Sequence, residues 1–186
     1  MANYGMAFDY KLCINCKACE VACKEENGID LGASNHRLWI SERFDNTQDF
    51  FELKQINFIQ NQCQQCQDAP CIKACPNDAI YKDDNGIVRL YKDKCDLSLH
   101  CMSACPYDAR YIDNKNKITD KCIFCADTRL SRGETTTACA ITCPSKLRIF
   151  GDLDDPNSDI SLTLKKRKYF QLKSNLNTKP KLFYLN

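Results

Sequence analysis

The stretch CQQCQDAPCIKACP at residues 63–76 decides how this chain folds, because its four cysteines are separated by two, four and three residues. Such short spacings let a turning loop aim several sulfurs at one centre, and the closing Cys-Pro suits a chain that leaves in an extended or turn conformation. Three further runs bring the total to fifteen cysteines, with none left over. The runs are Cys13, Cys16, Cys19 and Cys23; Cys63, Cys66, Cys71 and Cys75; Cys95, Cys101 and Cys105; and Cys122, Cys125, Cys139 and Cys143.

Tight cysteine runs that end in Cys-Pro are typical of [4Fe–4S] ligand sets. A cubane cluster takes one thiolate per iron, and in the bacterial run C-x2-C-x2-C-x3-C-P the fourth cysteine binds the other cluster of a pair. Zinc sites usually need two cysteine pairs separated by a spacer. A disulfide framework fits neither the odd cysteine count nor the length of 186 residues. The sequence therefore predicts iron–sulfur sites that carry electrons.

One of the four runs lacks a thiolate. In the frame set by the three cysteines of the third run, the vacant position is Ser98. A serine hydroxyl is a weaker acid than a thiol, whose reference pKa is about 8.5, and it offers a hard oxygen to iron. Two outcomes are open: the corner iron is lost, which leaves [3Fe–4S], or Ser98 binds as an alkoxide and retains [4Fe–4S]. His100 is expected to face solvent or form a hydrogen bond, and Asp96 to point away from this site.

Charge and hydropathy limit the partners. No apolar run approaches the roughly 20 residues that span a bilayer, and the start MANYGMAFDYKLC has none of the features of an export signal. Residues 161–186 carry seven basic groups and no acid, whereas the residues before them carry 19 basic and 24 acidic groups. This basic segment lacks the pattern of a nucleic-acid recognition module. Its apolar end, LFYLN, favours docking on a protein partner, although a solvated tail is the simpler alternative.

Short strands and helices are expected between the cysteine loops. Strands are predicted at 79–81, 87–90, 109–112 and 147–150, a turn at 84–86, and a helical segment at 71–75. Strand, cluster loop, helix and strand, repeated twice, form the small α+β ferredoxin unit, and four runs imply two such units. Long insertions lie at 24–62 and between Cys125 and Cys139. Because cluster binding is coupled to folding, the cluster-free protein is expected to be poorly folded.

The order of the runs resembles that of the iron–sulfur subunits of molybdopterin oxidoreductases related to dimethyl sulfoxide reductase. This group includes the polysulfide, thiosulfate and tetrathionate reductases, and the resemblance covers nearly the whole chain. Besides the cysteines, it is carried by the stretches CPNDAIYKDDNGIV, CPYDARYI, KCIFCADTRLSRG, FGDLDDPNS and LNTKPKLFYL. It implies that the first run pairs with the fourth, and the second with the third.

The resemblance implies four ligand sets, named here sites 1 to 4. Site 1 is Cys13, Cys16, Cys19 and Cys143, and site 2 is Cys63, Cys66, Cys71 and Cys105. Site 3 is Cys95, Cys101 and Cys75, with Ser98 where the fourth thiolate would be, and site 4 is Cys122, Cys125, Cys139 and Cys23. Sites 1, 2 and 4 would hold [4Fe–4S] clusters, and site 3 either [3Fe–4S] or a serine-ligated [4Fe–4S].

The resemblance also implies an architecture and a role. Residues 1–58 with 114–150 would form one ferredoxin-like lobe, 59–113 an inserted second lobe, and 151–186 an extended tail that docks on a partner. The chain would be a non-catalytic subunit in anaerobic respiration. It would relay single electrons from an integral-membrane quinol-oxidising subunit to a molybdopterin catalytic subunit, or in the reverse direction. Co-export with the catalytic subunit would place it at the periplasmic face of the membrane, with the cytoplasmic face as the alternative. The competing functions are a free-standing polyferredoxin for soluble redox enzymes and an iron–sulfur maturation or regulatory protein.

Overall fold

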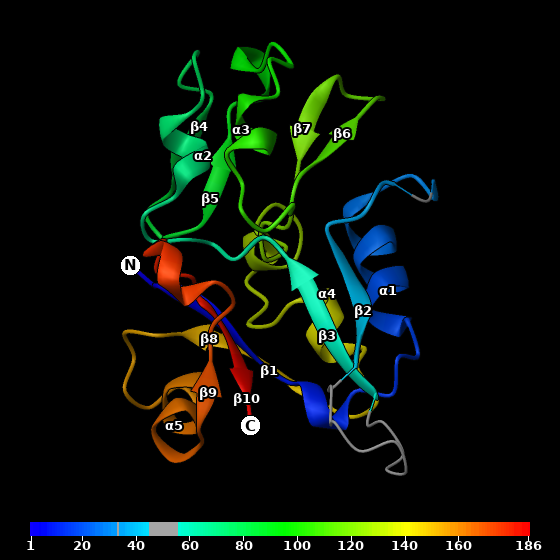
Figure 1. Ribbon diagram of the computed structural model, residues 1–186, viewed down its shortest axis with the longest axis vertical. Coiled ribbons are helices and arrows are strands. Elements are labelled where there is room, and N and C mark those ends of the chain that lie inside the picture. The colour runs from blue at the N-terminus through cyan, green and yellow to red at the C-terminus, as the bar shows by residue number, and fades with distance from the viewer. Residues whose placement is uncertain (33, 45–55) are drawn as a thin grey trace.

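The computed structural model describes residues 1–32, 34–44 and 56–186, which form a lower and an upper part in Figure 1. The lower part is built on a four-stranded sheet with the order β8-β1-β10-β9. Its strands are β1 (Tyr4–Asp9), β8 (Arg148–Asp152), β9 (Tyr169–Phe170) and β10 (Leu182–Leu185). Helix α5 (Asp159–Lys166) packs against β8 and β1, and the side chain of Ser158 caps it by accepting from the N–H of Ser161.

The upper part consists of two antiparallel hairpins and two short helices (Figure 1). The hairpins are β4 (Ile80–Lys82) with β5 (Val88–Leu90), and β6 (Tyr111–Asp113) with β7 (Ile118–Asp120). Helix α2 (Pro70–Lys73) packs against α3 (His100–Ser103). The first hairpin turns because the Asp83 carboxylate accepts from the N–H groups of Asn85 and Ile87 at 3.0 and 2.9 Å, while Gly86 has φ 68°. The strands expected after the Cys-Pro pairs are therefore confirmed.

A second pair of helices lies beside the lower sheet. Helix α1 (Ala18–Asn27) packs against α4 (Ala138–Ile141), and α1 ends at Gly28 with φ 59°, a left-handed cap that glycine adopts readily. Strands β2 (Leu38–Phe44) and β3 (Ile56–Gln62) form a hairpin within the predicted 24–62 insertion. Residues 33 and 45–55 of that insertion lie outside the described residues. Short 3-10 helices complete the fold: η1 (Tyr10–Leu12), η2 (Lys92–Lys94), η3 (Leu130–Arg132) and η4 (Ser174–Leu176).

The C-terminal segment 151–186 is not the extended tail that the resemblance implied. It contains α5, β9 and β10, and β10 is an inner strand of the lower sheet, parallel to β1 with Met6 opposite Leu182 and Phe8 opposite Tyr184. Leu182, Tyr184 and Leu185 are each at most 1% exposed. The apolar end of the sequence therefore completes its own hydrophobic core, which removes that surface from water.

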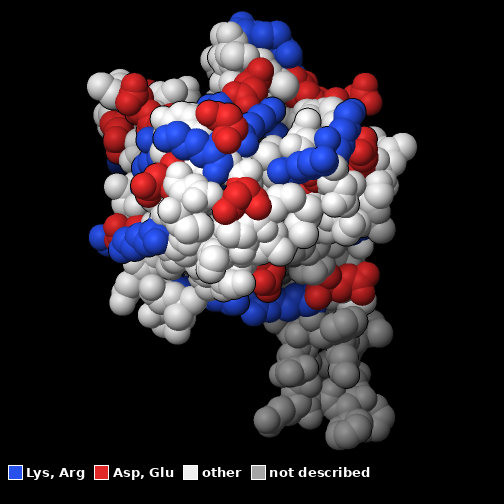
Figure 2. Space-filling view, turned by 90° about the horizontal axis from the view of Figure 1, so that it is seen from above, with Lys and Arg blue, Asp and Glu red and all other residues white. Residues whose placement is uncertain are grey.

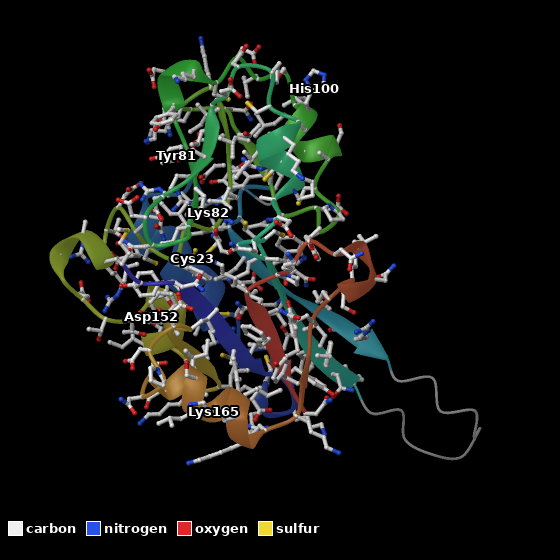
Figure 3. All side chains as sticks on the ribbon, turned by 90° about the vertical axis from the view of Figure 1, so that its left-hand side faces the viewer. Cys23, Tyr81, Lys82, His100, Asp152 and Lys165 are labelled. Atoms are coloured by element: carbon white, nitrogen blue, oxygen red, sulfur yellow. The ribbon has the colours of Figure 1, made fainter. Side chains whose placement is uncertain are left out.

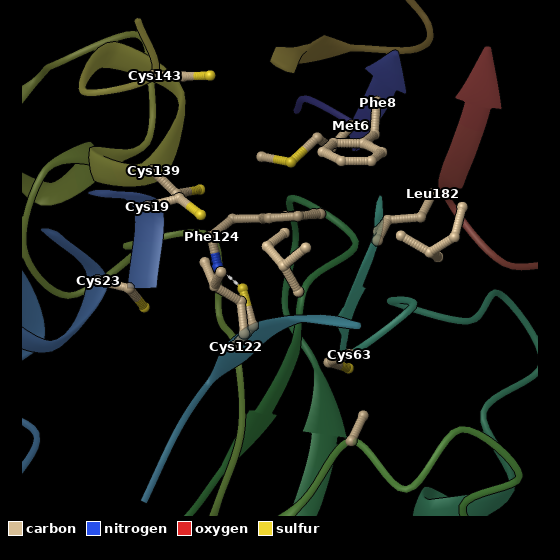
Figure 4. Packing of buried hydrophobic residues seen from close by; sticks show 14 of the residues in the cluster. Met6, Phe8, Cys19, Cys23, Cys63, Cys122, Phe124, Cys139, Cys143 and Leu182 are labelled. Carbon is tan, nitrogen blue, oxygen red and sulfur yellow. Dashed lines mark hydrogen bonds between the residues drawn. The ribbon is translucent and has the colours of Figure 1, made fainter. Parts of the chain in front are cut away.

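Tyr184 shows how closely this last strand is built into the core. Its hydroxyl donates to the backbone carbonyl of Gln60 at 2.7 Å, and its ring stacks on Phe170 at 5.3 Å between centroids. The Phe8 ring meets it edge-on at 6.1 Å. Figure 4 shows the same core continuing from Met6, Phe8 and Leu182 through Phe124 to the buried cysteines.

Two of the predicted domain boundaries cut through secondary structure. The limit at 58/59 falls inside β3, and the limit at 113/114 separates the paired strands β6 and β7.

Within the part of the chain that the structure describes, no helix is long and apolar enough to cross a membrane. Figure 2 looks onto the upper part from above, where acidic and basic side chains are interspersed.

Candidate iron–sulfur sites

Four cavities are lined by cysteines, and each brings together the thiols predicted for one site. The cysteines that line them are Cys13, Cys16, Cys19 and Cys143 at site 1; Cys63, Cys66, Cys71 and Cys105 at site 2; Cys75, Cys95 and Cys101 at site 3; and Cys23, Cys122, Cys125 and Cys139 at site 4. All fifteen cysteines are free thiols.

Helix packing brings cysteines from distant runs together. Cys23 on α1 lines a cavity with Cys139 on α4, because these two helices pack against each other. The contact between α2 and α3 brings the second and third runs together. Cys105 of the third run therefore lines site 2, and Cys75 of the second run lines site 3. Each cavity thus takes three cysteines, or two and Ser98, from one run and one cysteine from the paired run.

Left-handed backbone recurs inside every cysteine loop. A residue other than glycine has φ between 49° and 62° in each of the four loops. These residues are Asn15 and Lys17, Gln65, Leu97 and Leu99, and Phe124 and Cys125. Left-handed residues bend a loop so that N–H groups can face one centre, a concave arrangement that binds anions, including iron–sulfur clusters. The loops therefore carry conformational strain that a bound anionic group would repay.

The Cys-Pro pairs share a tight turn. The N–H of the third residue after the cysteine donates to the cysteine carbonyl, from Asp78, Asp108 and Lys146 at 3.5, 3.4 and 3.1 Å, and each of these residues has positive φ. Some N–H groups point at sulfur: that of Ala79 lies 3.3 Å from Sγ of Cys75. Phe124 donates likewise to Cys122 at 3.4 Å (Figure 4). Hydrogen bonds to the sulfurs are one of the levers that set cluster potentials.

Burial disfavours ionisation of several of these thiols. It raises the pKa of Cys19 to about 11 and that of Cys66 to about 12, with neighbouring cysteines adding to the effect at Cys66. Burial also raises the pKa of Cys23, Cys122 and Cys139 above the usual thiol value. Thiols ligate metal as thiolates, so binding releases these protons, and the positive charge of iron must offset the cost of burying the sulfurs as anions.

Buried cations lie against the cavities. Arg148, 7% exposed, lines site 1 and donates from Nε to Oε1 of Gln60 at 2.6 Å. Lys121, 3% exposed, lines site 2 and donates to the carbonyls of Val88 and Cys122. Arg110, 6% exposed, lines the same cavity, and its Nη2 is buried with no hydrogen-bond partner. An orphaned, buried guanidinium nitrogen beside four thiols fits a cavity that takes a group of negative charge.

Site 4 has a hydrogen-bonded chain of side chains on its outer side. Nδ2 of Asn27 lies 3.8 Å from the sulfurs of both Cys23 and Cys125, and Nη1 of Arg37 donates to Oδ1 of Asn27 at 2.8 Å. Arg37 also forms an ion pair with Asp120 at 2.7 Å. Asn27 and Arg37 both line the cavity of site 4, and Nδ2 of Asn27 also donates to the backbone carbonyl of Cys23 at 2.8 Å, which holds this amide beside the two sulfurs.

The arrangement suits a cluster better than a single metal ion. Zinc needs its four ligands within about 2.3 Å of one point. Among the described residues, which include every cysteine, no three His, Cys, Asp or Glu side chains converge closely enough to hold one ion. Free thiols that line four separate cavities, buried cations and N–H groups directed at sulfur all fit an anionic group such as an iron–sulfur cluster.

Site 3 differs from the others at its fourth corner. Ser98 lines the cavity and is exposed, whereas His100 does not line it and faces solvent at the outer edge of the upper part (Figure 3). Asp96 also lines the cavity, contrary to the expectation that it points away. Its Oδ1 accepts from the N–H of Ser98 at 3.0 Å, and hydrogen bonds from Ser98 and Asn77 lower the pKa of this carboxyl. The carboxylate thus holds the Ser98 loop in place.

The buried cations were missed from the sequence, although a signal for two of them exists. Arg110 and Arg148 each stand five residues after the cysteine of a Cys-Pro pair, at or just before the strand that follows the tight turn. The shared spacing could have indicated a shared position beside the clusters. Nothing in the sequence pattern marks Lys121 or Gln60 in this way.

Comparisons with known proteins agree with this chemistry. Two family models, both described as a 4Fe-4S dicluster domain, match residues 12–79 and 54–153. A polysulfide reductase chain of Wolinella succinogenes is 42% identical over 97% of this protein and 93% of its own length. The thiosulfate reductase electron transfer subunit PhsB of Salmonella typhi is 41% identical over 82% of this protein and 78% of its own length. Protein NrfC of Escherichia coli is 41% identical over 97% of this protein and 79% of its own length.

The resemblance noted from the sequence is therefore confirmed, and so are the paired 4Fe–4S domains. Because identities above 40% extend over nearly the whole length, the relationship concerns the entire fold and not only the cysteine loops. This protein belongs to the iron–sulfur electron-transfer subunits of the dimethyl sulfoxide, polysulfide and thiosulfate reductase type.

Proposed function

We propose that this protein relays single electrons through four clusters between a molybdopterin catalytic subunit and an integral-membrane quinol-oxidising subunit. Sites 1, 2 and 4 hold [4Fe–4S] clusters on four cysteines each, and site 3 holds its cluster on Cys75, Cys95 and Cys101. The observation that carries the proposal is the gathering of the fifteen cysteines into four cavities with the predicted membership. Sites 1 and 4 belong to one ferredoxin-like lobe, and sites 2 and 3 to the other.

The order of the sites supports a relay. The sulfurs of Cys19 at site 1 and Cys139 at site 4 are close enough to interact electrostatically, as are those of Cys122 at site 4 and Cys63 at site 2. Figure 4 shows these cysteines one after another along the core. Arg110 acts on sulfurs of both site 2 and site 3. The sites thus follow one another in the order 1, 4, 2, 3, from the lower part to the upper.

When bound, each cluster supplies a one-electron redox centre whose potential depends on net charge, hydrogen bonds to sulfur and burial. The protein contributes each of these factors. Its cysteine loops aim N–H groups at the sulfurs, its hydrophobic core keeps water from sites 2 and 4, and its buried cations set the local charge. No bond is made or broken in the relay, so catalysis is left to the partner subunit.

The partner proposal rests on the relatives and not on the C terminus. Because LFYL is an inner strand, it is not available to dock on another protein, and one argument against a free-standing polyferredoxin disappears. The relatives are named as a chain of polysulfide reductase, an electron transfer subunit of thiosulfate reductase and a subunit of sulfite dehydrogenase, and such names describe components of larger enzymes. Co-export with the catalytic subunit would place the complex at the periplasmic face of the membrane.

Anaerobic co-expression with a molybdopterin catalytic subunit and an integral-membrane quinol-oxidising subunit of this reductase type tests this function. The three subunits are expected to co-purify, with iron and acid-labile sulfide at the level of four clusters per copy of this protein. Addition of a quinol should bleach the cluster absorbance, and addition of the oxidised substrate should restore it. Purification of the protein alone, fully loaded and unresponsive to quinol, would favour the free-standing polyferredoxin.

Substitution of Cys23 tests the cross-ligation between runs. Cys23→Ala is expected to damage site 4 and spare site 1, because Cys23 lines the cavity of Cys122, Cys125 and Cys139. Cys19, one helical turn earlier on α1 and equally buried, lines site 1, so Cys19→Ala is the matched control. Low-temperature paramagnetic resonance that resolves individual clusters should show one different centre altered in each variant. Loss of the same centre in both variants would show that the pairing is wrong.

A further inference from the structure

Arg110 lies between the two cavities of the upper part. Its guanidinium lines site 2 beside Cys71, and the two side chains interact electrostatically. From Nη1 it donates to Oγ1 of Thr119 at 3.4 Å. Thr119 is 1% exposed and lines site 3, where its hydroxyl lies 3.4 Å from Sγ of Cys101. Two polar contacts, from Arg110 to Thr119 and from Thr119 to Cys101, therefore connect the lining of site 2 with a sulfur of site 3.

The direction of the hydrogen bonds follows from the groups involved. A guanidinium only donates, so Oγ1 of Thr119 accepts from Arg110, and its single hydrogen is free to point at Cys101. The negative groups that act on Arg110 are the sulfurs of Cys71, Cys101 and Cys63. A buried cation is costly unless such charge compensates it, and its Nη2 still has no partner. Arg110 is thus placed to interact with negative charge at both site 2 and site 3.

We propose that Arg110 and Thr119 form a charged bridge that raises the reduction potentials of sites 2 and 3 together. The proposal rests on the proposed function, because both sites must hold clusters. Reduction adds one electron, and so one negative charge, to a site without transfer of a proton or ligand. A fixed cation stabilises that extra charge on either side, and an arginine in a protein does not lose its proton. Arg110 is a positioning residue for the relay and ligates no iron.

Redox titration of the intact complex, followed by paramagnetic resonance, tests the bridge. Arg110→Met removes the charge and keeps most of the side-chain volume. It is expected to weaken reduction of sites 2 and 3 by at least tenfold in equilibrium constant, a fall of about 59 mV for a one-electron couple. Sites 1 and 4 should keep their wild-type potentials. Thr119→Val removes only the hydroxyl and should lower the potential of site 3 alone.

Two further variants complete the design. Arg110→Lys keeps the charge and is expected to stay within about threefold of wild type at site 2. Arg148→Met removes the cation that acts on Cys13, Cys19 and Cys139, so it should shift sites 1 and 4 instead. If the Arg110→Met protein assembles no clusters, the Arg110→Lys and Thr119→Val variants test the bridge instead, through the potentials of sites 2 and 3.

The outcomes separate the bridge from the proposed function. Iron and acid-labile sulfide in the wild-type protein test whether clusters are present at all, and their absence would refute the function. The bridge alone is overturned, and the proposed function stands, if all clusters are present but the expected shifts in potential are absent. These are the shifts of sites 2 and 3 in Arg110→Met and that of site 3 in Thr119→Val. An equal shift of all four centres would also overturn it, because it would show a general loss of structure.

Discussion

Deletion of residues 182–186 is expected to abolish the folded, cluster-loaded protein. The deletion removes β10 from its place between β1 and β9, together with the buried side chains of Leu182, Tyr184 and Leu185. Burial of an apolar side chain stabilises by roughly 1.5–3 kcal/mol, so the three contribute on the order of 5 kcal/mol or more. Natural domains have only about 5–15 kcal/mol in total. The measurement is soluble yield, iron content and cluster absorbance of the truncated protein.

Exposed basic residues near the C terminus provide the matched control. Lys166 and Lys168 lie with exposed side chains at the end of α5 and just after it, and Lys166→Ser with Lys168→Ser leaves β10 in place. This double variant is expected to keep wild-type iron content and thermal stability. A truncated protein that is soluble, fully loaded and merely released from its partner would instead restore the view of the C terminus as a docking tail.

The second large effect is expected at Ser98. The air-oxidised wild-type protein should show a [3Fe–4S] signal in low-temperature paramagnetic resonance, and Ser98→Cys should abolish it. A thiolate replaces a hard, weakly acidic hydroxyl at the open corner of site 3, so the variant can hold the fourth iron. Ser98 lines the cavity and its loop is held by Asp96, so the new sulfur enters a position already shaped for a ligand. The variant should contain one more iron atom per copy of the protein.

A serine from the same run serves as the control for this substitution. Ser103 is exposed at the end of α3 and does not line site 3, so Ser103→Cys should leave both the signal and the iron content unchanged. Only [4Fe–4S] signals in the wild-type protein, unaltered by Ser98→Cys, would show that serine or another group already retains the fourth iron.

The sequence alone determined the chemistry of this protein and much of its local structure. The cysteines of one run lie within a short loop, so their spacing can be recognised in the sequence. We could therefore predict without a structure the cysteines of each run, the missing thiolate at Ser98 and the strands after the Cys-Pro pairs. The pairing of Cys23 with the fourth run came from a resemblance, because no local rule joins residues as far apart in sequence as Cys23 and Cys122. Contacts between α1 and α4 bring those thiols into one cavity.

Tertiary structure alone decided the fate of the C terminus and the charge around the sites. A basic segment ending in LFYLN reads as a docking tail, since the sequence does not show that β1 leaves an edge open for a parallel strand. Likewise, Arg110 and Arg148 read as ordinary surface charges until packing buries them beside thiols. Burial depends on contacts among segments far apart in the sequence. Local pattern can therefore name the ligands of a cluster, but only the assembled core determines which charges surround it.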